Sequence, residues 1–513
     1  MRKSLVRLTP IVLAVMAAAS AGAGPSPERW IEVRSAHFIV LTDAGEKQAR
    51  TTAVQFERMH AVFHLLLPAA GDDSDPPITV LAVKDRRDMH ALEPAEYLGK
   101  DSLDLSGFFL RAPDTNYILV RLDADEEHAY ATVYHEYTHY LLRKADGWLP
   151  LWLNEGLAQF YENTDIHDRN AQLGQPSLAQ LQYLTATPML PLATLFAVDA
   201  RSPYYREEQK GTIFYAESWA LTHFLIFGDR TQGTHRIHDY ADLLAHGEDP
   251  VTAARQAFGD LDDLQTQLSA YVRQRSLSCF TMKTELSLKD ATLSTRAVPR
   301  TEIDADRANI LLAMGRTQDA QTLLDAVLRD DPDNELAHES IGYLRFLQGD
   351  YDGAKTSYSH AIALNSHSFL AHYYYAVMTL HGGDSAHEDA AESSLLRSIQ
   401  LNPQFAPSYD ALAMFYASRR RNLDQAHTLN LRAVELAPES LGYRVDSADV
   451  LAEQRQFAEA ASVLRTAEHL AHTPSEIDAI ERRLRRYEIE QATQSRVQAR
   501  LTAEDKELDS IAK

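Results

Sequence analysis

Residues 133–144 read VYHEYTHYLLRK and contain two histidines four positions apart, His135 and His139, with Glu136 directly after the first. On a helix, positions i and i+4 share one face, with Cβ atoms about 5–6 Å apart, so two imidazoles can bind one metal ion. Glu136 is then rotated about 100° from His135, where a carboxylate can act as general base toward a zinc-activated water. Because the chain has 21 histidines, a chance match is the alternative.

The residues around this motif predict the helix that the spacing requires, over about residues 125–145. The acidic stretch RLDADEE precedes the motif and suits the positive end of a helix dipole. Arg143 and Lys144 suit the last turn, and Gly147 follows as a stop signal. The two histidines are therefore expected on one helical face.

A second segment, LPLWLNEGLAQFYE at residues 149–162, predicts another helix and offers Glu155 as a third ligand, 16 residues beyond His139. Two histidines and one glutamate are a standard ligand set for a catalytic zinc, which keeps its fourth position open. Gly156 would let the two helices approach closely. Gln159 is expected either to hold a ligand imidazole or to be a solvated helix residue.

HEYTH followed by WLNEGLA resembles the gluzincin class of zinc metallopeptidases, and more narrowly the bacterial peptidase MA-like proteins that join such a domain to tetratricopeptide (TPR) repeats. The resemblance implies a zincin-like α+β fold, with His135, His139 and Glu155 as zinc ligands and Glu136 as catalytic base. It is specific over residues 135–162. No GAMEN stretch of the aminopeptidase type is present, so endopeptidase and exopeptidase activity both stay open.

Two elements outside the motif are further candidates for the active site. The segment 107–122 predicts a strand hairpin, and its part 107–110 is a candidate for holding an extended substrate by strand addition or is a plain core strand. The expected helix over 211–226 contains Tyr215. Its phenol is expected to stabilise an oxyanion, as a tyrosine does in several gluzincins, or to be a core contact.

The N-terminal part of the domain shows a strand, helix, strand order. WIEVRSAHFIVLT (30–42) predicts one or two strands, ITVLAV another, and a helix is expected between them over about 44–67. That helix carries His60 and His64, also four apart. Since no glutamate adjoins the pair and no third ligand is evident nearby, we interpret them as surface or packing histidines.

Internal repeats begin near residue 301. Five segments align on one alanine, at spacings of 34, 37, 35 and 34 residues: Ala320, Ala354, Ala391, Ala426 and Ala460. This is the TPR period, and five repeats suffice for a stable solenoid. Tyrosines on the first helices of the repeats are expected in part to line a groove that binds a protein partner: Tyr373, Tyr374, Tyr375, Tyr409 and Tyr416.

The ends and composition of the chain indicate an exported protein. Residues 1–23 read as a signal peptide, with a basic start, a short apolar run and small residues, so no membrane span is expected after cleavage. Cys279 is the single cysteine, which excludes an intramolecular disulfide. The net charge of −23 argues against nucleic acid as a partner. A periplasmic or secreted location is expected.

The predicted organisation is an α+β zincin-like metallopeptidase domain followed by an all-α TPR solenoid. The boundaries are a signal peptide (1–23), the metallopeptidase-like domain (24–275), a linker (276–300), the repeats (301–475) and a charged capping helix and tail (476–513) that frays after about 495. The linker could hold one edge strand in FTMKTELSL and is expected to tolerate a cut near 298. We expect a zinc-dependent peptidase whose repeats recruit protein substrate or partner. The alternative is a TPR interaction scaffold with an inactive or structural zincin domain.

Overall fold

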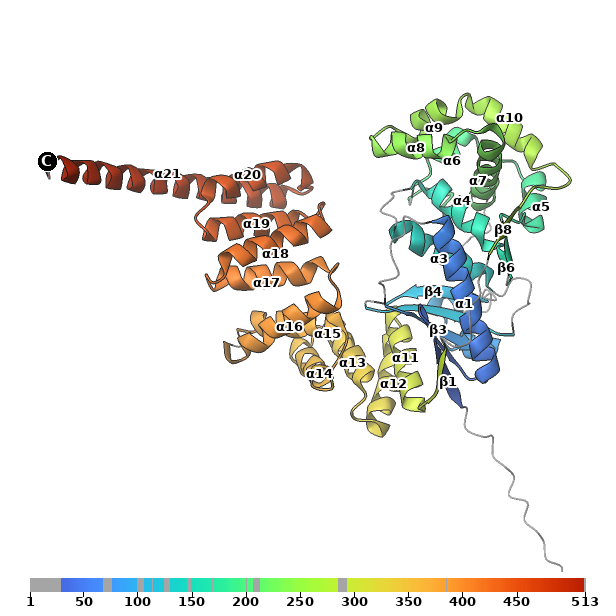
Figure 1. Ribbon diagram of the computed structural model, residues 1–513, viewed down its shortest axis with the longest axis horizontal. Coiled ribbons are helices and arrows are strands. Elements are labelled where there is room, and N and C mark those ends of the chain that lie inside the picture. The colour runs from blue at the N-terminus through green and yellow to red at the C-terminus, as the bar shows by residue number, and fades with distance from the viewer. Residues whose placement is uncertain are drawn as a thin grey trace, which may run out of the picture.

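The computed structural model describes residues 29–67, 76–98, 106–112, 114–123, 130–144, 149–167, 169–199, 201–205, 213–284, 293–383 and 385–511 (Figure 1). The predicted signal peptide, the acidic residues after Asp123 and Gly147 lie outside these ranges. None of the helices within them combines the length and the apolar character that crossing a bilayer would require.

The N-terminal half is built on a mixed six-stranded sheet with the order β4-β5-β3-β2-β1-β9. The central pairs β2–β3 and β3–β5 are parallel, whereas β1–β2, β1–β9 and β4–β5 are antiparallel. The hairpin β4–β5 places β4 at one edge. The strands are β1 (Trp30–Arg34), β2 (Phe38–Thr42), β3 (Ile78–Val83), β4 (Gly107–Arg111), β5 (Asn116–Arg121) and β9 (Ser294–Val298).

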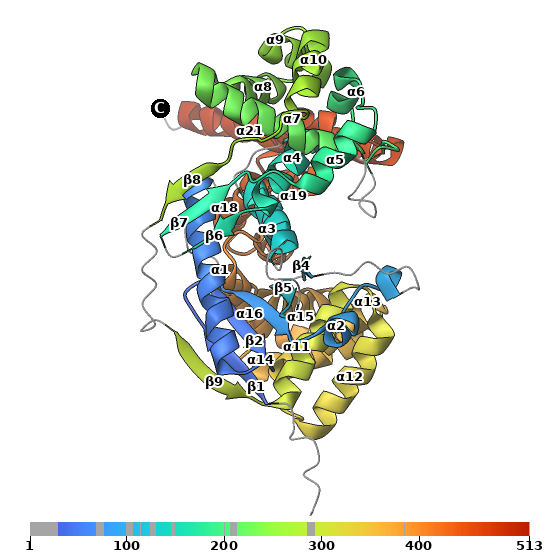
Figure 2. The same ribbon diagram turned by 90° about the vertical axis from the view of Figure 1, so that its right-hand side faces the viewer.

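Both faces of this sheet are buried. Alternate residues such as Val80 and Ala82 pack under α1 (Glu46–Leu66) and α3 (Ala131–Lys144). Their neighbours Leu81 and Val83 face the other side, where they share one core with α2 (Arg86–His90) and with α11 (Arg300–Ala313), the first helix of the repeats. Figures 1 and 2 both show α11 lying against the sheet.

A mainly helical layer follows α3 and has its own core around Trp152 and Trp219. Its helices are α4 (Leu151–Glu162), α5 (Leu178–Ala186), α6 (Leu192–Phe196), α7 (Ile213–Gln232), α8 (Arg236–Ala245), α9 (Pro250–Phe258) and α10 (Leu261–Tyr271). A small antiparallel sheet, in the order β6-β7-β8, joins this layer to α1. Its strands are β6 (Asp165–Ile166), β7 (Asn170–Leu173) and β8 (Phe280–Lys283).

The described C-terminal half is a row of helical hairpins, as the repeat period predicted (Figure 1). The aligned alanines lie in the second helix of each hairpin, and all five are fully buried because adjacent helices approach closely there. The helices are α11, α12 (Thr317–Asp330), α13 (Glu335–Leu347), α14 (Tyr351–Ala363), α15 (Phe369–His381), α16 (Glu388–Leu401), α17 (Ala406–Ser418), α18 (Leu423–Leu436), α19 (Leu441–Glu453) and α20 (Phe457–Ala467).

The helix ends differ from the predictions in three places. Helix α7 ends at Gln232, beyond the expected residue 226. The motif helix α3 begins at Ala131, later than the expected residue 125. The capping helix α21 (Pro474–Ile511) continues well beyond the point at which fraying was expected. Charged pairs along its surface, such as Arg500 with Glu504, support the last turns.

Residues 276–300, predicted as a linker that could hold one edge strand in FTMKTELSL, contain two described strands, one of them in that stretch. This segment contributes β8 to the small sheet and β9 to the large one. Polar contacts also join the halves: Arg316 donates to the carbonyl oxygens of Ala91 and Glu93 at 3.0 and 2.9 Å. Local composition could not show this, because the contacts join residues more than 100 positions apart. A cut near residue 298 would therefore expose one face of the sheet.

Candidate metal centre

Helices α3 and α4 are neighbours, and each is held by its apolar face. Tyr134, Tyr137 and Leu141 anchor α3 in the core beneath the sheet. Trp152 and Leu153 anchor the start of α4 in the helical layer. Pro150 is the N-cap residue of α4. Its backbone is extended, and the helix begins at the next residue, Leu151. The polar faces left between the two helices hold the motif residues.

The three predicted ligands converge. The Nε2 atoms of His135 and His139 are 3.2 Å apart, and the Oε2 atom of Glu155 lies 3.5 Å from each of them. His135 and Glu155 are buried, and His139 is partly exposed. The rings of the two histidines are inclined by 79°, so their Nε2 atoms point to a common position from different directions.

These distances fit a zinc ion. Four ligands at about 2.0–2.1 Å around a tetrahedral zinc are separated from one another by roughly 3.3–3.4 Å. The three protein atoms, separated by 3.2, 3.5 and 3.5 Å, are close to this arrangement. Apart from the imidazoles of His135 and His139, the buried Oε2 atom of Glu155 has no hydrogen-bond partner among the described residues, as expected for an atom that binds a cation.

Two residues that the sequence did not single out hold the histidines by their other ring nitrogen. Asn154 Oδ1 contacts His139 Nδ1, and Glu162 Oε2 lies 3.3 Å from His135 Nδ1. Such contacts fix the ring orientation and leave Nε2 for the metal. A sequence signal existed for Glu162, since it lies two helical turns after Glu155.

The environment of Glu155 favours its ionised form. Burial alone would raise its pKa, but the contacts and charges of His135 and His139 outweigh burial and hold the pKa well below the usual range. Its second oxygen, Oε1, lies 3.5 Å from the hydroxyl of Tyr205, which is at the long limit of a hydrogen bond. Tyr205 was also not singled out from the sequence.

Glu136 is half-buried on α3, directly beside the cluster. Its charge acts on Arg143, two turns further along the helix: burial and the nearby Arg111 lower the pKa of Arg143, and Glu136 opposes them. Arg111 is the last residue of the edge strand β4. Glu136 therefore lies on the side of α3 that β4 approaches.

Gly107, the first residue of β4, is required for this approach. A Cβ there would lie 2.7 Å from the Leu119 carbonyl oxygen and 3.1 Å from the side chain of Val133 on α3. Phe109 packs on Tyr140 of α3 with ring centroids 5.5 Å apart. The strand 107–110, a candidate for substrate binding, thus lies along the motif helix.

Two smaller expectations were wrong. Gly156 does not face α3: a Cβ there would clash with Thr222 and Ser218, so the glycine brings α4 close to α7. Gln159 contacts Gln180 and not a ligand imidazole. In both cases α4 packs against helices that come later in the chain, which the motif spacing does not reveal.

Tyr215 is buried in α7 and lies behind Tyr205, with ring centroids 6.1 Å apart and an angle of 29° between the rings. Phe214 packs edge-on against it. A core contact, the alternative weighed for this residue, is therefore part of its environment. Its role as oxyanion stabiliser remains a prediction.

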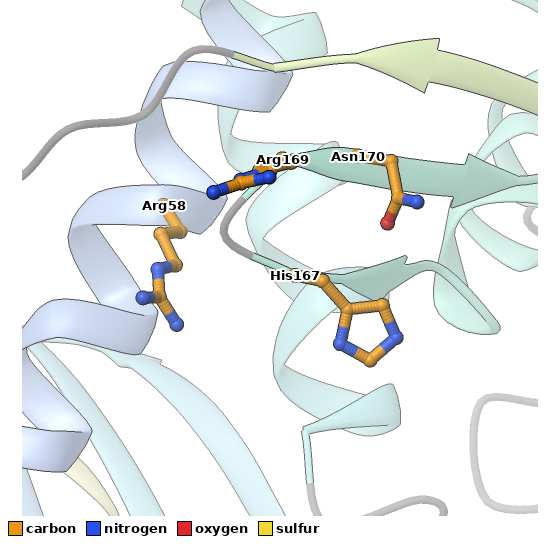
Figure 3. A pocket seen from close by; sticks show the side chains of 4 residues that line it. All are labelled: Arg58, His167, Arg169 and Asn170. Atoms are coloured by element: carbon orange, nitrogen blue, oxygen red, sulfur yellow. The ribbon is translucent and has the colours of Figure 1, made fainter.

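A surface pocket of about 590 Å³ lies elsewhere, between α1 and the turn that joins β6 to β7 (Figure 3). It is lined by Arg58, His167, Arg169 and Asn170 and by none of the three ligands. Two guanidinium groups line it, and its imidazole, His167, contacts Asp165 at 2.9 Å. The pocket is therefore distinct from the candidate metal centre.

Two family models match the chain. One, described as Tetratricopeptide repeat, covers residues 305–354. The other, described as Protein of unknown function (DUF1570), covers residues 129–242, which include the three predicted ligands, Glu136 and Tyr215. No curated protein matches. The repeat period, the described helical hairpins and the match over residues 305–354 identify the C-terminal half as a TPR solenoid. The mixed sheet is not assigned to a zincin fold.

Several solved structures are similar to about a third of the chain. YrrB, described as a TPR protein with an unusual peptide-binding site, is 17% identical, with 35% of this chain and 90% of that chain covered and a TM-score of 0.31. MamA from Desulfovibrio magneticus RS-1 is 19% identical, with 34% and 96% covered and a TM-score of 0.29. Pseudomonas aeruginosa PilF is 17% identical, with 40% and 90% covered and a TM-score of 0.31.

Proposed function

We propose that the protein is an exported zinc-dependent peptidase whose TPR array recruits a protein substrate or partner. The observation that carries the proposal is the convergence of the His135, His139 and Glu155 ligand atoms at the separations of a tetrahedral zinc site. Three protein ligands leave one position for water or substrate, whereas structural zinc sites fill all four. An ion bound there would supply Lewis acidity toward water and an amide carbonyl.

Glu136 is the proposed general base. It would accept the proton of the attacking water and deliver it to the nitrogen of the leaving amine, so that the amide bond breaks without a free amide anion. Its half-buried position beside the ligands suits this shuttle. Tyr215, and Tyr205 in front of it, are the phenols near the cluster that could donate to the developing oxyanion.

The edge strand β4 is the proposed binding surface for the substrate backbone. Among the strands that the structure describes, β4 pairs only with β5. An extended peptide could add to its other side as a further strand, next to α3 and the metal ligands. This arrangement recognises backbone more than side chains, which fits a peptidase acting on unfolded segments.

The test is metal analysis and peptide-library cleavage by the full-length protein purified from the exported fraction. We expect about one tightly bound zinc at this centre, cleavage that a chelator abolishes, and recovery after zinc is added back. A protein that binds a target through its repeats but cleaves no peptide with zinc restored would support the scaffold alternative.

A further inference from the structure

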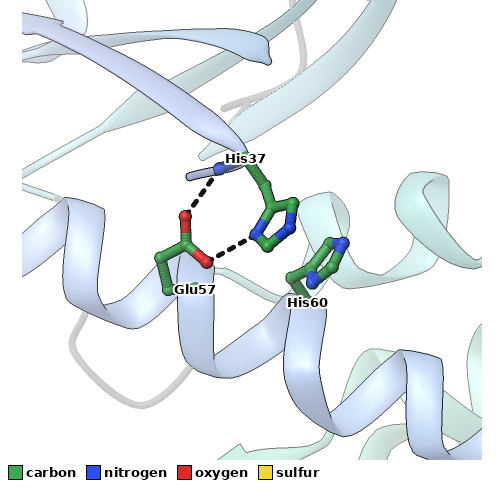
Figure 4. Close-up of side chains that lie close together, drawn as sticks. All are labelled: His37, Glu57 and His60. Atoms are coloured by element: carbon green, nitrogen blue, oxygen red, sulfur yellow. Dashed lines mark hydrogen bonds and ion pairs between the residues drawn. The ribbon is translucent and has the colours of Figure 1, made fainter. Parts of the chain in front are cut away.

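A second cluster of metal-binding side chains lies at the other end of the sheet from β4. His37 is in the turn between β1 and β2, and Glu57 and His60 lie one turn apart on α1 (Figure 4). One ligand atom from each of the three lies within 4.8 Å of the others. None of these residues belongs to the α3–α4 centre.

The buried carboxylate of Glu57 orients His37. Its Oε1 accepts the backbone N–H of His37 and its Oε2 contacts His37 Nδ1, both at 2.8 Å (Figure 4). A carboxylate on one ring nitrogen is the arrangement that directs the other nitrogen toward a metal. Glu162 holds His135 in the same way, although at the longer distance of 3.3 Å.

Two further imidazoles follow His37: the ring of His60 stacks on it, and the ring of His64 lies next to His60. The ring of His60 lies parallel to that of His37, with centroids 3.7 Å apart and an angle of 12°, and His64 follows at 4.0 Å from His60. His60 and His64 are four residues apart on α1, as His135 and His139 are on α3. Imidazole is a preferred ligand of zinc, copper and nickel ions.

We propose that His37, His60 and His64, with Glu57 holding His37, form a second site for a divalent transition metal. Lone pairs of imidazole nitrogens lie in the ring planes, so stacked rings do not yet point at one ion, and binding must turn them. Glu57 keeps His37 in place, so the rings that turn are those of His60 and His64, which are partly exposed on α1. The rings of His135 and His139 are already inclined, so the second site binds more weakly, by at least about tenfold, and exchanges faster.

The test is zinc stoichiometry of the full-length protein by equilibrium dialysis and elemental analysis. We expect two classes of bound zinc. The double variant His37→Gln/His60→Gln removes the weaker class and keeps the tighter one, whereas His135→Ala/His139→Ala does the reverse. The matched control, His238→Gln/His246→Gln, changes two exposed histidines at α8 and retains both classes. Thermal unfolding of each variant verifies that it folds.

A second readout does not depend on stoichiometry. Cu²⁺ added to His135→Ala/His139→Ala protein should give an electron paramagnetic resonance spectrum with at least two coordinated nitrogens, and His60→Gln should remove one of them. Two results together would contradict the proposal: the wild type binds only the zinc that His135→Ala removes, and His60→Gln leaves the Cu²⁺ spectrum unchanged. The stacked histidines would then be a packing contact. If the α3–α4 centre does not bind zinc and the second site does, the wild type binds a single zinc, and His37→Gln/His60→Gln removes it.

Discussion

The two faces of the large sheet pack against different parts of the molecule. On one face, α1 and α3 pack by apolar residues and carry histidine and glutamate clusters along their other sides. On the opposite face, α11 and the first repeats form a core with Trp30, Leu41, Leu81 and Leu119. One face therefore holds the candidate chemistry and the other joins the repeats to it. The repeat array is part of the fold of the N-terminal half, and its orientation toward the candidate centre is set by that contact.

The largest expected effect comes from removing the second face. A chain that ends at Pro299 keeps β9 but loses α11, so the apolar residues beneath it become exposed to water. We expect this protein to aggregate or to lose cooperative unfolding, as measured by circular dichroism and dye binding. A chain that ends at Leu364 keeps the shared core and should fold. A soluble, cooperatively folded 1–299 protein would show that the two halves are independent.

The next effect tests the chemical face. Glu136→Gln preserves shape and hydrogen bonding but cannot accept a proton, so hydrolysis should fall by about 10²–10⁴ while zinc content stays the same. Peptide cleavage and metal analysis check both values. Glu46→Gln, on the exposed start of α1, is the matched control and should change neither. Activity of the Glu136 variant within about threefold of wild type would exclude it as the base.

A smaller effect concerns the residues behind the ligands. Asn154→Ala and Glu162→Gln remove the partners of the two Nδ1 atoms, and each should weaken zinc binding by about 10–100-fold. Competition with a chromophoric chelator measures this affinity. Gln159→Ala is the control on the same helix, because Gln159 contacts Gln180 instead. Equal losses in all three variants would indicate a general disturbance of α4.

The smallest effect tests a polar contact between the two halves. Arg316 donates to two carbonyl oxygens of the segment after α2, so Arg316→Ala should lower the free energy of unfolding by about 1.5–3 kcal/mol. Chemical denaturation measures the change. Arg485→Ala, on the exposed surface of α21, should remain within about 0.5 kcal/mol of wild type. Equal values for both variants would mean that packing alone joins the halves.

Two regions show how far local patterns reach. The spacing of His135, His139 and Glu155 predicted that they meet, and the structure brings them together. The same i, i+4 spacing at His60 and His64 was interpreted as packing, since the sequence near the pair shows no third partner. Glu57 was within one turn of His60, but His37 comes from a strand turn 23 residues earlier, and only the packing of α1 on β2 brings it there.

Helices α1, α3, α4 and α7 and the repeat period follow from the sequence, because each depends on a regular backbone period of 3.6 residues or about 34 residues. The sequence likewise contained the three candidate ligands in order. The tertiary structure decided the partners of the ligand nitrogens, the contact of Tyr205 with Glu155 and the core shared by the sheet and the repeats. These contacts join residues that are separated in the chain, and they form only when the apolar faces of the helices and the sheet pack against one another.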